Sequence, residues 1–246
     1  MHRVRCMHSD TAAGGRADVH WSEEPPKKSI KADCVQVFVT PVDNEFRAES
    51  YSINGKRIQF CGHGSLAAAW VAFSEHAPAA ATLNFFNANQ SWQARRVGDE
   101  ITLVYARPRF RPCVVPEFAS GALGTQPQAA AVVGDDTGYL ILQFPDAESV
   151  RSLQPDPDAI MTASQRALIV TASESSADFV FRYFAPQYGE PEDAATGSAA
   201  VQLAAYWGAK LPSEEFHVRQ LSHHGAEMHV TCGGDEVALT APVAYR

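Results

Sequence analysis

The stretch that decides the fold is Phe60–Trp70, which reads FCGHGSLAAAW. A strand-like run stops at a Gly-His-Gly turn, and an alanine-rich helical pattern begins directly after it. Gly62 and Gly64 let the backbone approach a ligand closely and adopt unusual dihedral angles. The unpaired N–H groups in the first turn of a helix favour an anionic group such as a carboxylate or a phosphate. The stretch therefore predicts an anion-binding corner with Cys61 and His63 beside it.

A second stretch repeats this local plan. Ala194–Trp207 reads AATGSAAVQLAAYW and again runs from a Gly-Ser pair into a helix of small residues with an aromatic end. When Ser65 is set on Ser198, the pairs Gly64–Gly197, Ala67–Ala200, Ala72–Ala205 and Phe73–Tyr206 also coincide. Two halves with the same plan suggest an internal duplication and a cleft between two helix N-termini.

The composition narrows the class of protein. With 246 residues, the chain is long enough for one large domain or two of ordinary size, and its hydrophobic share of 46% is that of a globular protein. The net charge of −8 and the lack of a long basic cluster argue against nucleic-acid binding. No apolar run approaches the roughly 20 residues that span a bilayer, and no signal peptide is apparent. Five cysteines without paired spacing fit a reducing compartment, so we expect a cytoplasmic protein.

Short strands dominate the rest of the chain. Residues 1–31 show no clear pattern, whereas Asn54-Gly55 predicts a hairpin that folds residues 46–53 onto residues 56–60. A helix is expected from about Ser65 to His76. Repeated prolines and glycines between residues 108 and 127 predict a boundary, which gives lobes 1–118 and 119–246. The last strand of the chain could pair with the first lobe. Many strands with a few central helices indicate an α+β fold. Further strands are expected at 35–39, 81–86, 91–96, 101–106, 139–144, 167–171, 179–185, 216–220, 227–231 and 236–239.

Several side chains near the two corners could carry chemistry. Asp193 precedes the second helix, where a carboxylate either caps the helix or acts on a ligand. His63 could accept or donate a proton near neutral pH, and Cys61 could act as a thiol activated by the helix terminus. Glu190 and Glu192 are expected to be solvated. No zinc-ligand spacing, P-loop or dinucleotide motif is present, so no metal or organic cofactor is expected.

Three motifs together resemble the PhzF-like (phenazine biosynthesis) family. They occur in the family's order and separation, and the likeness extends from about residue 35 to the end of the chain. The motifs are FCGHGSLAAA at 60–69, RYFAP at 182–186 with EDAATGSAA at 192–200, and QLSHHG at 220–225.

This resemblance implies a diaminopimelate-epimerase-like fold. Two similar lobes, each a curled mixed sheet around a central helix, would enclose the active site between them. The family isomerises small carboxylated substrates without a cofactor, using a glutamate together with a histidine and an aspartate that correspond to His63 and Asp193. The resemblance also implies a homodimer and a small anionic metabolite as ligand. Substrate binding would fall to Gly62, Gly64, Ser65, Thr196, Gly197, Ser198, Gln220 and Ser222.

One departure from the family affects the chemistry. The family's glutamate precedes the strand that here begins at Val35, but the segment Ser29–Cys34 contains none. Asp33 is the nearest carboxylate and Cys34 a second candidate. The motif around Cys61 also resembles the first thiol motif of proline racemases, which makes Cys61 a further candidate base.

Two functions therefore remain open. The chain is either an isomerase in which Asp33, Cys61 or His63 removes a carbon-bound proton, or an inactive relative that binds a small acid or serves as a scaffold. Incorporation of solvent deuterium into candidate acids separates the two.

Overall fold

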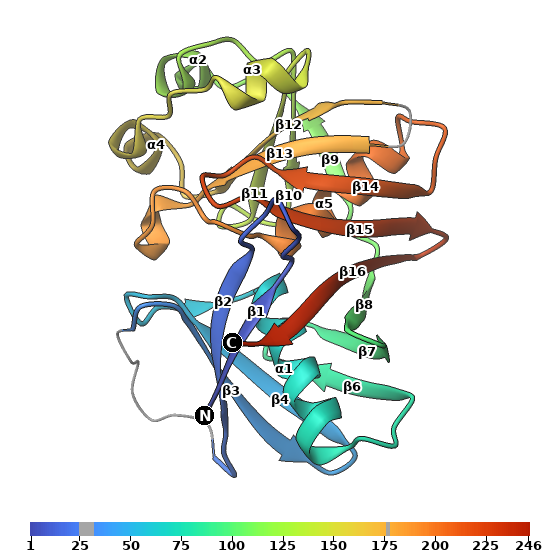
Figure 1. Cartoon of the computed structure of the whole chain (residues 1–246). Coiled ribbons are helices and arrows are strands. Elements are labelled where there is room, and N and C mark those ends of the chain that lie inside the picture. Colours follow the sequence, from blue (N-terminus) through green and yellow to red (C-terminus); the bar gives the residue numbers. More distant parts are fainter. Residues whose placement is uncertain (25–31, 176–177) are drawn as a thin grey trace.

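The computed structural model describes residues 1–24, 32–175 and 178–246, and its described strands divide into two curled sheets (Figure 1). The strands of the first half are β1 His2–Cys6, β2 Gly15–Trp21, β3 Val35–Val42, β4 Glu45–Tyr51, β5 Arg57–Ile58, β6 Thr82–Phe86, β7 Ser91–Val97 and β8 Glu100–Ala106. Those of the second half are β9 Phe110–Cys113, β10 Ala129–Val133, β11 Tyr139–Gln143, β12 Ala167–Ser173, β13 Asp178–Phe184, β14 Glu215–Gln220, β15 Ala226–Gly233 and β16 Glu236–Tyr245.

Backbone pairing links these strands in a single order. That order is β1-β2-β3-β4-β6-β7-β8-β16-β15-β14-β13-β12-β11-β10-β9, with β5 paired to β4. The long strand β16 pairs with β8 and β15, and its last residues pair with β1. The first half is therefore a closed ring that β16 completes, while the same strand also forms one edge of the second half.

Each half wraps around one central helix. Helix α1, Gly62–Val71, continues into a π-helix at Ala72–His76, and helix α5 spans Gly197–Gly208. All ten residues of α1 are buried, as are those of α5 except its last. A helix enclosed on every side needs an apolar surface all round, and the alanine-rich sequences supply it with little bulk.

The remaining helices lie on the outside of the second sheet (Figure 1). They are α2 Phe118–Leu123, α3 Ala147–Arg151 and α4 Pro157–Ala163, with a 3-10 turn at Pro186–Tyr188. Leu123, Val150 and Ile160 from these helices pack with the outward-facing residues of β10–β13 in a second, smaller core. The main core lies inside the two sheets, around α1 and α5.

The structure bears out most of the expected elements and adjusts some. The Asn54-Gly55 hairpin forms, with Gly55 at a φ of 79° and Ser50 opposite Ile58. Helix α1 begins at Gly62 rather than Ser65, because the glycine turn itself is helical. Residues 1–24, which showed no pattern, supply β1 and β2. The basic pair Lys27-Lys28 and the prolines before it lie outside the described residues.

Candidate functional site

A cavity of about 190 Å³ lies where the two lobes meet, at the N-termini of α1 and α5. Residues from both sequence halves line it. The first half contributes Val35, Ser52, Ile53, Ile58, Gln59, Phe60, Cys61, Gly62, His63, Asn89 and Gln90; the second contributes Thr137, Gly138, Tyr139, Ala167, Tyr183, Ala185, Tyr188, Glu190, Asp193, Thr196 and Ser198.

The two helix N-termini are in direct contact. A Cβ atom at Gly62 would lie 2.5 Å from the backbone nitrogen of Ser198 and 2.6 Å from the Cα of Gly197. This approach is possible because both corners carry glycine. The predicted pair of helix ends therefore faces one shared cavity.

Both helix ends leave their backbone N–H groups without a side-chain cap. Neither α1 nor α5 has a side-chain cap or an acidic residue in its first turn. In contrast, Asp146 caps α3 and Asp156 caps α4, in positions away from the cavity. The first-turn N–H groups of α1 and α5, together with the two helix dipoles, make this end of the cavity favourable for an anion.

His63 has one ring nitrogen fixed by the protein. Its Nδ1 lies 3.0 Å from the carbonyl oxygen of Ala195. A carbonyl only accepts hydrogen bonds, so Nδ1 carries the proton and the neutral ring keeps a lone pair on Nε2. The side chain is buried in the cavity wall, which leaves Nε2 as the nitrogen that can receive a proton from a ligand.

Asp193 lines the cavity and is tied to the corner before α5. Its carboxylate accepts a hydrogen bond of 2.6 Å from the hydroxyl of Thr196 and does not cap the backbone of the helix. Gln220 braces the same corner: its Oε1 accepts from the Thr196 backbone N–H at 2.6 Å, and its Nε2 donates to the Asp193 carbonyl at 2.6 Å. The Ser222 hydroxyl donates to the Ala194 carbonyl at 2.7 Å.

The structure divides the predicted substrate-binding residues into two groups. Gly62, Thr196 and Ser198 line the cavity. Gly64, Ser65, Gly197, Gln220 and Ser222 do not, and support the wall from behind. Gly64, for example, packs where a Cβ would lie 2.7 Å from the Ser50 hydroxyl and 2.9 Å from the Cys61 sulfur.

Cys61 lines the cavity as a neutral thiol. Burial, the largest cause, raises its pKa to about 12; a backbone hydrogen bond from Gly64 partly opposes this, while Asp193 adds to it. The expected activation by the helix terminus is therefore outweighed by the loss of hydration. A thiol in this state is a poor base near neutral pH.

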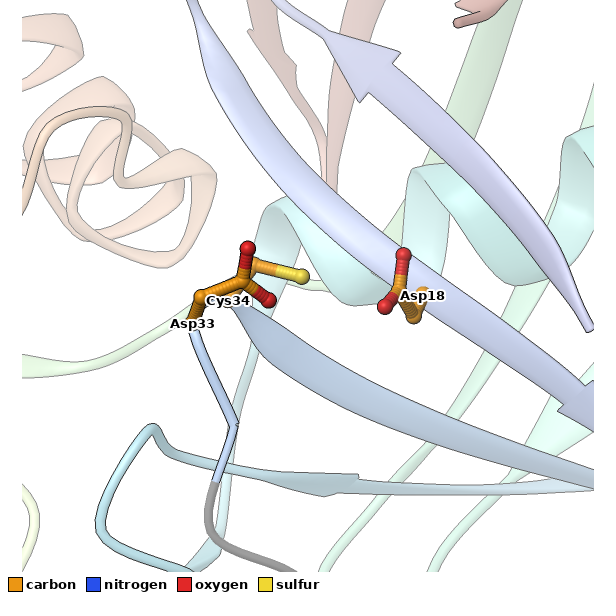
Figure 2. A group of neighbouring side chains, drawn as sticks. All are labelled: Asp18, Asp33 and Cys34. Atoms are coloured by element: carbon orange, nitrogen blue, oxygen red, sulfur yellow. The ribbon is translucent and has the colours of Figure 1, made fainter.

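Asp33 and Cys34 lie away from the cavity. Figure 2 shows both at the start of β3, with Asp18 on the neighbouring strand β2. Oxygen or sulfur atoms of these three side chains lie within 4.8 Å of one another, but Arg3 already binds both oxygens of Asp18, at 2.8 and 2.9 Å. Asp33 is not among the described residues that line the cavity. The structure therefore gives no geometric reason to consider Asp33 the base.

Asp33 lies in the bend before β3 and not in the strand itself. The strand begins at Val35, which lines the cavity. Asp33 instead reaches Arg3, 3.7 Å away, and its side chain is 65% exposed. Residues 29–31 of the segment lie outside the described residues. The start of β3 thus presents an apolar side chain where a carboxylate was expected.

Several cavity residues were not assigned to the site from the sequence, among them three tyrosines and Glu190. Tyr139, Tyr183 and Tyr188 contribute aromatic rings to the lining. Glu190 also lines the cavity and, as expected, is exposed to solvent. No local pattern in the sequence distinguishes it from an ordinary surface glutamate.

Comparisons with known proteins agree with this architecture. The protein-family model for phenazine biosynthesis-like proteins (PhzC-PhzF) matches residues 36–233. An uncharacterized isomerase of Vibrio cholerae is 36% identical over 197 residues, which cover 80% of this chain and 68% of that protein. An uncharacterized isomerase of Pseudomonas aeruginosa is 30% identical over 207 residues, which cover 84% of this chain and 78% of that protein.

A solved structure has the same fold. The crystal structure of a PhzF-family phenazine biosynthesis protein of Enterococcus faecalis has a TM-score of 0.84 at 23% sequence identity, covering 99% of this chain and 95% of that chain. This likeness confirms the predicted α+β fold of two similar lobes. Among the described residues, no helix combines the length and apolarity needed to cross a membrane.

Proposed function

Because the chain belongs to the phenazine biosynthesis-like family, we propose that it is an isomerase that shifts a proton on a small carboxylate-bearing substrate without a cofactor. The observation that carries this proposal is the meeting of two uncapped helix N-termini at one cavity that also contains His63 and Asp193. The N–H groups of the two corners would hold the substrate carboxylate and the negative charge that develops when a carbon-bound proton leaves.

The cavity wall supports a substrate with an apolar, flat portion. Phe60 and the three tyrosines contribute aromatic rings to the lining, and Gly62, Thr196 and Ser198 belong to the two helix corners. An acid with a ring or a conjugated double bond would place its carboxylate at the helices and its carbon skeleton against the rings. Conjugation also delocalises the charge left by the departing proton.

Of the predicted catalytic residues, Cys61, His63 and Asp193 line the cavity. Because Cys61 is a poor base there, His63 and Asp193 are the two that we assign to the reaction. The free Nε2 of His63 can accept a proton or a hydrogen bond, and the Asp193 carboxylate lies at the opposite corner beside Thr196. These two groups would orient the substrate or return its proton. Positioned acid–base groups contribute about 10²–10⁴-fold to rate.

Proton exchange tests this function directly. The protein is incubated in D₂O with a panel of small amino acids, hydroxy acids and cyclic unsaturated carboxylic acids, and deuterium at carbon is followed by NMR. We expect deuterium to be incorporated into at least one acid. The rate of incorporation should be about 10²–10⁴-fold lower in His63→Ala and in Asp193→Asn. The control is His229→Ala, which removes an exposed histidine on β15 outside the cavity.

A second function is favoured by the apolar start of β3. With Val35 in the wall and Asp33 outside it, the carboxylate expected before β3 is missing, as in a protein that binds a small acid without converting it. Calorimetric titration of the same panel separates the two functions. Binding without any deuterium incorporation supports the binding protein, whereas exchange that depends on His63 and Asp193 supports the isomerase.

A further inference from the structure

The cavity contains a carboxylate that no role yet explains. Among the described residues that line it, Glu190 and Asp193 carry carboxyl groups. The Asp193 carboxylate is engaged by the Thr196 hydroxyl at 2.6 Å. The Glu190 carboxylate makes no hydrogen bond or ion pair with residues 1–24, 32–175 or 178–246. Its neighbour Glu192, in contrast, is held at 2.8 Å by the Arg182 guanidinium.

The backbone around Glu190 is fixed in place. Gly189 takes a φ of 106°, which favours glycine, and a Cβ there would lie 2.8 Å from the side-chain nitrogen of Asn54 in the first lobe. Glu190 then forms an isolated β-bridge with Ala185, another cavity residue. Lys56 of the first lobe also donates to the Gln187 carbonyl at 2.6 Å. Contacts from both lobes therefore hold Glu190 at the cavity.

The surroundings of Glu190 favour proton uptake. Partial burial is the main cause that raises the pKa of its carboxyl, and the negative charge of Asp193 raises it further. His63, Arg16 and His224 act in the opposite direction. A carboxylate whose pKa lies above the usual glutamate range is a stronger base and returns its proton less readily to water.

We propose that Glu190 is the catalytic base of this cavity and supplies the carboxylate that is missing before β3. This inference rests on the proposed isomerase function. It assigns proton transfer to Glu190, while His63 and Asp193 position the substrate.

The proton balance of this step is simple. The Glu190 carboxylate takes a proton from a substrate carbon, and the electron pair of the broken C–H bond delocalises into the conjugated acid. The resulting carboxylic acid then delivers a proton to a second carbon, which restores the Glu190 carboxylate. Because the Glu190 residue is exposed to solvent, its proton can exchange with water between the two steps. The product formed in D₂O should therefore carry deuterium at the second carbon.

The experiment compares variants on whichever panel acid the wild-type protein deuterates. Glu190→Gln keeps the size of the side chain but cannot accept the proton, so kcat should fall about 10²–10⁴-fold with little change in KM. In Glu190→Ala, kcat should fall by a similar factor. Added formate should restore part of it, because formate can supply a carboxylate in the space left by the side chain. Asp33→Asn is the matched control, since it removes a carboxylate that lies outside the cavity, and it should retain wild-type turnover.

The possible results separate this inference from the proposed function. A wild-type protein that exchanges protons, together with an inactive Glu190→Gln variant and formate rescue of Glu190→Ala, supports both. Wild-type turnover in Glu190→Gln, or loss of turnover in Asp33→Asn, overturns the role of Glu190 and leaves the isomerase standing. A wild-type protein that exchanges no acid in the panel overturns the isomerase and the Glu190 base together.

Discussion

At the scale of the residue, Gly62 determines how closely the two helix ends approach. The atoms that a side chain would meet there are backbone atoms of Ser198 and Gly197, which cannot rotate aside. The close contact of the two helix ends therefore depends on the absence of a Cβ atom at Gly62.

Gly62→Ala should separate the corners. We expect a loss of stability of about 1–3 kcal/mol from overpacking, and weaker binding of any acid because the two N-termini no longer face the same point. Urea denaturation and calorimetry measure the two effects. Gly121→Ala is the control: it lies in α2 with open space around the added Cβ, so it should be neutral or slightly stabilising. An unchanged unfolding midpoint in Gly62→Ala would contradict the tight contact.

At the scale of the element, the corner before α5 depends on a strand that arrives later in the chain. Gln220 ends β14 and uses both ends of its amide to hold residues 193–196. It is nearly fully buried, so its partners have no water to replace it. Although Gln220 was predicted to contact the substrate, its side chain is engaged by the backbone of the corner before α5.

Removing this brace should destabilise the corner. Gln220→Ala leaves the Thr196 backbone N–H unpaired in a buried place, which costs about 1–3 kcal/mol. Urea denaturation should show that loss, and acid binding should weaken with it. Gln165→Ala, at an exposed position, is the control and should change neither. If Gln220→Ala binds acids more weakly but unfolds at the wild-type midpoint, Gln220 contacts the ligand instead.

The elements differ in how readily the sequence reveals them. The two glycine corners, their helices and the Asn54-Gly55 hairpin were predictable because backbone chemistry dictates them locally. Strand β2 was not, since Asp18 is buried in its middle and breaks the apolar pattern; its ion pair with Arg3 comes from another strand. Strand β9 was not predicted either, because it contains Pro112, a residue that is uncommon within strands.

The candidate site shows the same limit. His63, Asp193 and the helix ends could be predicted because they lie beside recognisable turns. Glu190 could not, because an isolated glutamate after a glycine normally faces water, and its place in the cavity depends on Asn54 and Lys56 of the other lobe. The position of Asp33 could not be predicted either, because it lies in the bend before β3 and its carboxylate faces Arg3 on another strand.

At the scale of the whole molecule, Arg3 on β1 and Asp18 on β2 link two neighbouring strands beside the place where β16 closes the first ring. The Arg3 guanidinium, by hydrogen bonding, is the main cause that holds the pKa of the buried Asp18 carboxyl below its usual range; burial opposes this. A carboxyl with a lowered folded-state pKa stabilises the fold above its ordinary pKa, and that contribution is lost as the pH falls through the lowered value.

Arg3→Gln should therefore destabilise the protein in a pH-dependent way. We expect a lower urea midpoint at neutral pH, where the Asp18 charge loses its partner, and a difference that shrinks in strongly acidic buffer, where Asp18 is protonated in both proteins. Arg109→Gln, at an exposed position after β8, should leave the midpoint unchanged at both values. A deficit in Arg3→Gln that is equal at both values would show that the side chain acts by packing alone.

Strand β16 has a consequence for the order in which the protein can be assembled. Val4 pairs with Tyr245, so the ring that encloses α1 needs a segment that the ribosome makes only after the entire second lobe. Until β16 is made, the nascent first lobe has an open edge that leaves its alanine-rich helix exposed to water or to a chaperone. Domains that mature one after another during translation avoid this delay; here both halves reach their final form together, when a single shared strand arrives.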